Sequence, residues 1–110
     1  MTEILNHEFE GSHSITFDCD TPADEAVYSA GHEPNGYFWE GVAQLVVSTE
    51  ARAISDKLDY DSEGSMFCAL SNDKAALETL AALMAPIIND PQNAAIVVAR
   101  AAELEFEFDD

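Results

Sequence analysis

The sequence is poor in basic residues. Only 4 of its 110 residues are Lys or Arg, against 22 Asp or Glu, and the formal net charge is −18 at pH 7. Such a charge repels the phosphates of nucleic acids and of anionic membranes, while it attracts basic surfaces. We therefore expect neither nucleic acid nor membrane as a partner. The same charge also suits a protein adapted for solubility or for high salt.

Cysteines and long apolar runs are scarce as well. The two cysteines, Cys19 and Cys68, are too few for a disulfide framework, and neither has a metal-binding spacing around it, so we expect both to be reduced. There is no hydrophobic leader segment and no apolar run near the length of a membrane span. These features predict a cytoplasmic protein.

Catalytic motifs are also missing. His7, His13 and His32 are scattered, without the spacing that places two imidazoles on one metal. Cys68 has no Lys or Arg beside it in sequence that would lower its pKa, and its surroundings favour a small core residue. With no nucleophile and base, metal cluster or cofactor loop in view, we expect no enzyme activity, no metal and no cofactor.

One acidic stretch has a superficial likeness to a calcium loop. Asp59, Asp61 and Glu63 alternate near Gly64, but the twelve-residue register and its terminal bidentate glutamate are absent. A solvated hairpin tip is the favoured interpretation.

The remaining composition is that of a folded protein. Apolar residues make up 47% of the chain, and a chain of this length can bury roughly two-thirds of its unfolded surface. We expect one domain over residues 1–110. Disorder is not expected outside the termini.

A turn that runs into an amphipathic helix organises the middle of the chain. Pro34, Asn35 and Gly36 predict a tight reversal with positive φ at Gly36, so the helix is expected over about residues 37–54. Apolar residues recur at spacings of three and four, which predicts one buried face. These residues are Phe38, Val42, Leu45, Val46 and Thr49.

Alternation predicts strands on both sides of this helix. From Ser12 to Cys19, Ile15 and Phe17 share the inward face, whereas residues 1–10 fit either a frayed end or a short strand. Residues 57–61 and 66–70 flank a turn and predict a β-hairpin, whose returning strand is apolar on both faces and therefore central. Residues 103–110 alternate phenylalanine with glutamate, which predicts an edge strand that closes the sheet.

Three further helices are expected from caps and periodicity. A short one covers residues 23–30 and ends at Gly31, and another begins at Asp90 and Pro91. An alanine-rich one follows residues 71–73, where Ser71, Asn72 and Asp73 are all possible N-caps. The fold class predicted is α+β, with a small antiparallel sheet packed against three to four helices in a single domain.

Three stretches of the chain are distinctive: Gly31–Trp39 with its Asn-Gly-Tyr-x-Trp element, Phe67–Ala69 and Phe106–Asp110. Together they resemble the immunity protein 51 family. The resemblance covers nearly the whole chain. Members of the family are small α+β immunity proteins of bacterial polymorphic toxin systems, so the resemblance implies a protein that binds and neutralises a cognate toxin, without catalytic residues.

The same central stretch supplies candidate contact residues. Trp39 lies about 100° around the helix from Phe38, so it is expected at the edge of the apolar stripe, although a core position is the more common fate of a lone tryptophan. Aromatic residues beside acids are typical of a contact for a basic partner. The candidate partner-binding residues are Glu33, Tyr37, Trp39, Glu40, Asp59, Asp61 and Glu63.

The predicted function is tight binding of one toxin domain. The acidic charge of the chain is expected to speed its encounter with a basic surface on that toxin. Two other classes fit the sequence less well: an acidic adaptor or decoy for basic proteins, and a small hydrolase. The sequence does not indicate an oligomeric state.

Overall fold

The computed structural model describes all 110 residues, which form one four-stranded antiparallel sheet and five helical segments. The strands lie in the order β1-β2-β4-β3. The predicted α+β class is confirmed. In chain order the elements are β1 (Leu5–Phe9), β2 (Ser12–Asp18), α1 (Asp24–Ser29), α2 (Gly36–Glu50), the 3-10 helix η1 (Arg52–Lys57), β3 (Asp59–Tyr60), β4 (Met66–Ser71), α3 (Lys74–Ile88) and α4 (Pro91–Glu103).

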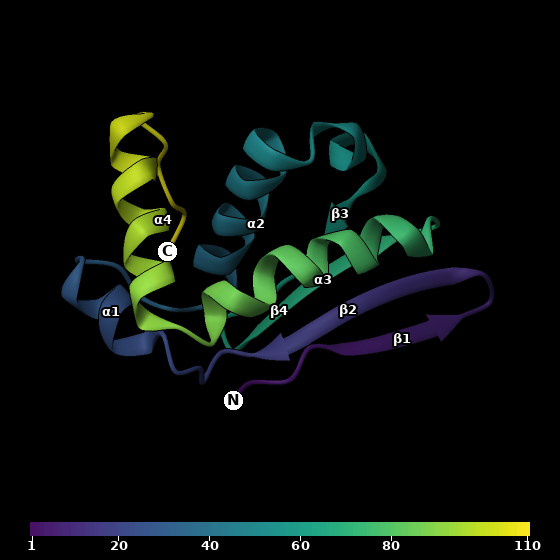
Figure 1. Ribbon diagram of the computed structural model, residues 1–110. Helices are drawn as coiled ribbons and strands as arrows, with labels where there is room; N and C mark the ends of the chain where they lie inside the picture. Colours follow the sequence, from purple (N-terminus) through teal and green to yellow (C-terminus); the bar gives the residue numbers. More distant parts are fainter.

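The helices cover one face of the sheet. Figure 1 shows α2 and α3 above the strands, with α1 and α4 together at the end where β2 finishes. Because side chains alternate along a strand, the covered face takes every second residue. On β2 these are Ile15 and Phe17, and on β4 they are Phe67 and Ala69, all of them at most 1% exposed. The predicted hairpin and the central position of its returning strand are confirmed.

The opposite face of the sheet carries no helix (Figure 1). The register places Leu5 beside Thr16 and Thr16 beside Cys68, so these side chains form one row across that face. Leu5 and Phe9 on β1 are 48% and 76% exposed. Residues 1–10, for which the sequence left two possibilities, therefore contain a true edge strand. We call this uncovered side the open face.

Local capping signals are confirmed at most helix ends. The Asp73 side chain accepts hydrogen bonds from two N–H groups in the first turn of α3, and Asp90 accepts one at α4. Gly31 follows α1 with φ of +87°, as its predicted role as terminator requires. The long central helix is shorter than expected, because Ala51 leaves the helical conformation with φ of −150° and η1 continues separately.

The turn before α2 differs from the prediction. Gly36 does not have positive φ; it is the first residue of α2, and Asn35 caps the helix by accepting a hydrogen bond from the N–H of Phe38 (2.9 Å). Gly36 is required for a different reason. A Cβ atom there would collide with the backbone carbonyl oxygens of Glu63 and Met66.

The C-terminal segment is not an edge strand, so that prediction is wrong. After α4 the chain folds back over the start of α2, where Phe108 packs against Phe38 and His32 with ring centroids 4.7 and 5.0 Å apart. The Asp110 carboxylate accepts a hydrogen bond from the N–H of Glu33 (2.7 Å). The alternation of phenylalanines reflects packing against these aromatic side chains, and no strand pairs with it.

Replacement of Gly36 by alanine should destabilise the protein, because the new methyl group meets two fixed backbone carbonyls of the hairpin. Overpacking of this kind costs roughly 2 kcal/mol, which lowers the Tm of a domain of this size by about 10 °C. Thermal unfolding followed by circular dichroism measures the change.

Gly64→Ala is the matched control, since a Cβ atom at Gly64 has no neighbour within 4 Å. Its Tm should stay within about 3 °C of the parent, the range of a neutral surface change. Equal Tm values for both variants would contradict the close approach at Gly36.

Candidate functional site

The start of α2 docks onto the tip of the β3–β4 hairpin through two polar contacts. The N–H of Gly36 donates to the carbonyl oxygen of Gly64 (3.2 Å), and the Glu40 carboxylate accepts from the N–H of Ser62 (3.1 Å). The Ser62 hydroxyl in turn accepts from the N–H of Cys68 (3.0 Å). These bonds fix acidic residues of the helix and of the hairpin beside one another.

Three carboxylates converge here, those of Glu40, Asp61 and Glu63, which we call the acidic patch. Burial raises the pKa of the Cys68 thiol, and the negative charges of Asp61, Glu40 and Glu63 raise it further. Burial, followed by the charge of Glu40, also raises the pKa of Tyr60 to about 12. The acidic patch therefore carries a negative potential that acts on two separate neighbouring groups.

Two more predicted contact residues flank the acidic patch along the chain. Tyr37 is 43% exposed and lies three residues before Glu40, so both share one face of α2. Glu33 is exposed, and its backbone N–H is held by Asp110. The tail thereby fixes the backbone just before the helix, a contact that the sequence analysis missed.

Trp39 is not on the surface. Its side chain is 0% exposed and packs edge-on against Phe17 and Phe38, with ring centroids 6.0 and 4.9 Å away. The expectation that the indole is partly presented to a partner is wrong, and the core alternative is confirmed. The reason is the sheet: α2 packs on β4, and from there the Trp39 ring reaches Phe17 of the neighbouring strand β2. Its Nε1 has no hydrogen-bond partner.

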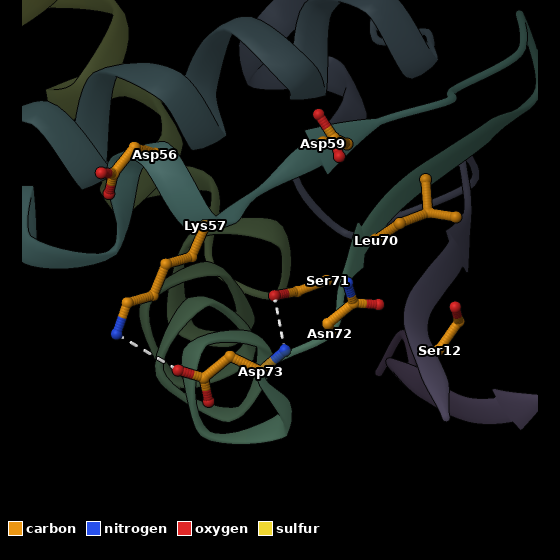
Figure 2. Close-up of a pocket in the computed structure, with 8 residues that line it drawn as sticks. All are labelled: Ser12, Asp56, Lys57, Asp59, Leu70, Ser71, Asn72 and Asp73. Atoms are coloured by element: carbon orange, nitrogen blue, oxygen red, sulfur yellow. Dashed lines mark hydrogen bonds and ion pairs between the residues drawn. The ribbon is translucent and has the colours of Figure 1, made fainter. Parts of the chain in front are cut away.

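Asp59 lies two residues before Asp61 of the acidic patch. It lines a hollow of about 600 Å³ near the start of α3. Figure 2 shows Lys57 turned toward Asp73 and the Ser71 hydroxyl on the N–H of Asp73. The hydrogen bond from Lys57 lowers the pKa of Asp73. Lys57 therefore stabilises the charged form of the N-cap residue of α3. Of the seven predicted contact residues, Trp39 is thus in the core and the other six are exposed or half-buried.

The histidines and cysteines are also dispersed. His7 hydrogen-bonds Thr16 (3.0 Å) and His32 hydrogen-bonds Asp110 (3.0 Å), while His13 lies on β2. Both cysteines are free thiols. No group of three or more His, Cys, Asp or Glu side chains is placed to hold a metal ion, and no helix is long and apolar enough to span a bilayer.

Comparison with known proteins agrees with the resemblance. The family model described as immunity protein 51 matches residues 3–103. The chain belongs to the immunity protein 51 family. No curated protein and no solved structure matches it. The match includes the whole acidic patch and ends at the last residue of α4, so the aromatic tail lies outside it.

The two thiols of this immunity protein 51 family member should react slowly. Burial, with the charge of Asp24, raises the pKa of Cys19 to about 11, and burial with the acidic patch raises that of Cys68. A raised pKa leaves less thiolate at a given pH, and the thiolate is the nucleophile. At pH 8 the native chain should react with iodoacetamide at least about tenfold more slowly than the urea-unfolded chain.

Mass spectrometry of alkylated protein against time measures both rates. The native rate should go on rising with pH above about 9, where the rate of the unfolded chain levels off, because the pKa values of both thiols are raised in the folded chain. A thiol that reacts at pH 8 as fast in the native chain as in the unfolded chain would contradict the burial and charge described, and would reopen a nucleophilic role.

Proposed function

We propose that this chain is an immunity protein that binds a cognate toxin domain and blocks it by direct contact. The observation that carries the proposal is the family match over residues 3–103. The structure adds a rigid surface suited to binding, since the acidic patch is held by backbone hydrogen bonds on two elements. We also propose that the encounter takes place in the cytoplasm, the compartment predicted from the sequence.

The charge distribution supports a basic toxin surface as the target. Residues 1–51 contain no Lys or Arg, and all four basic residues of the chain lie between Arg52 and Arg100. One of the four, Lys57, is paired with Asp73. An unbalanced field of this kind accelerates the encounter with an oppositely charged partner more than it strengthens the final complex. We assign the first contacts to the acidic patch, with Glu33 and Tyr37 beside it.

The alternative that keeps a specific observation in its favour is an acidic adaptor or decoy, because a charge of −18 would attract many basic proteins. The two proposals differ in selectivity. An immunity protein should bind one toxin domain far more tightly than a basic bystander such as lysozyme, whereas an adaptor should bind both with similar affinity.

Electrostatic steering is tested by measuring, in a stopped-flow instrument, the rate of association with the toxin domain encoded by the adjacent gene. Raising salt from 0.1 M to 1 M shortens the Debye length from roughly 10 Å to roughly 3 Å. The association rate should therefore fall as salt rises, while the dissociation rate changes less. An association rate that is flat across this range would contradict steering.

Two triple variants separate local from global charge. Glu40→Gln/Asp61→Asn/Glu63→Gln neutralises the acidic patch, and the amide at position 40 can still accept from Ser62. Association at low salt should slow by roughly three- to tenfold. The control neutralises three exposed carboxylates on other helices, Glu25, Glu78 and Glu103. Equal slowing by both variants would show that net charge acts and that the acidic patch has no special part.

A further inference from the structure

The free edge strand β1 is the second feature that favours a protein partner. It pairs with β2 on one side only, and all five of its residues are exposed. The other edge strand, β3, has only two residues. Proteins usually protect an edge by shortness, charged side chains, proline or a covering helix. β1 has five residues, no proline and no covering helix (Figure 1), and Glu8 is its only charged side chain, so its outer row of N–H and C=O groups is available to a segment that tolerates a glutamate.

Apolar side chains accompany this edge on the open face. Leu5 and Phe9 are 48% and 76% exposed and share that face with His7, since alternate residues point to the same side. A hollow of about 350 Å³ lies beside Phe9 and extends to Leu70 on β4. An added strand could therefore gain main-chain hydrogen bonds at the edge and apolar contact over Leu5 and Phe9.

The charge around β1 selects the kind of strand. Glu3, Glu8 and Glu10 lie on or beside it, and Asp18 and Asp59 lie on the open face. Neither β1 nor β2 contains a Lys or Arg, and Lys74 of α3 lines a hollow with Asn6 and Glu8 on the covered side. A second copy of the chain would bring another charge of −18 to this edge, so like-charge repulsion opposes self-pairing, whereas a basic segment is attracted.

We propose that an extended basic segment of the toxin adds to β1 as a fifth strand of the sheet, with apolar side chains over Leu5 and Phe9. This inference rests on the proposed function, because the segment belongs to the toxin. It assigns the stable, specific contact to the edge and the open face, while the acidic patch steers the encounter.

A peptide tests the chemistry without the toxin. A seven-residue peptide of alternating Lys and Val is titrated into labelled full-length protein, and the backbone amide resonances are followed by NMR. The largest shifts should fall on residues 5–9. The same peptide with alternate backbone nitrogens methylated cannot pair as a strand, and a Glu–Val peptide has the wrong charge. Both should bind at least about tenfold more weakly.

Leu5→Lys should weaken binding of the Lys–Val peptide at least about fivefold, because it removes an apolar contact and adds a like charge at the edge. Leu104→Lys is the matched control: it makes the same substitution at a leucine that is 54% exposed and lies after α4. It should change the affinity less than about twofold. Thermal unfolding verifies that both variants remain folded.

Other patterns would overturn the inference. Peptide shifts confined to the acidic patch, or equal binding of the methylated peptide, would show that charge alone attracts the segment. Light scattering that detects a dimer broken by Leu5→Lys would assign the edge to a second copy.

Amide hydrogen exchange with the toxin domain separates this inference from the proposed function. Protection of the β1 amides in the complex supports both. A tight complex that leaves β1 exchange unchanged overturns the edge pairing and leaves the proposed function standing. Absence of any complex overturns the proposed function itself, and with it the assignment of the segment to a toxin.

Discussion

The close approach of α2 to the β3–β4 hairpin is the constraint on which the rest of the structure depends. A residue without a side chain at Gly36 lets the first turn of the helix reach the carbonyls of Glu63 and Met66. That contact sets how α2 lies over the sheet, and so it decides that Trp39 is buried. It also brings Glu40 to the N–H of Ser62, which assembles the acidic patch from two elements.

Gathering three carboxylates at one place costs stability in the free protein, because like charges repel and few cations are nearby. Burial and then these three charges raise the pKa of Cys68, and burial and then Glu40 alone raise that of Tyr60. A basic partner would relieve this repulsion on binding. Membership of the immunity protein 51 family is consistent with carboxylates that are kept together for binding a partner.

Sequence reasoning succeeded where the signal is local. Asp73 and Asp90 are caps recognisable from a few neighbouring residues, and the α+β class follows from the periods of the apolar residues. It failed where distant segments decide the outcome. The close contact at Gly36 depends on a hairpin more than twenty residues away, and the burial of Trp39 depends on Phe17 of β2. Phe108 alternates with glutamates as a strand would, although it packs on α2.

The candidate site shows the same division. Exposure of Glu33, Tyr37, Asp61 and Glu63 agrees with their polarity, but the contact of Glu40 with Ser62 required the packing of α2 on the hairpin. Leu5, His7 and Phe9 alternate with period two, as the exposed side of an edge strand would. A stretch of five residues is too short for this pattern alone to distinguish a strand from a frayed end.

The most direct test of the central claim is growth of a bacterial host that expresses the adjacent toxin domain, with and without this chain. The account predicts that co-expression of the wild-type chain restores growth, and that the chain and the toxin domain co-purify as one complex from those cells. Unrelieved toxicity in cells that contain the folded chain at a level above that of the toxin would contradict it.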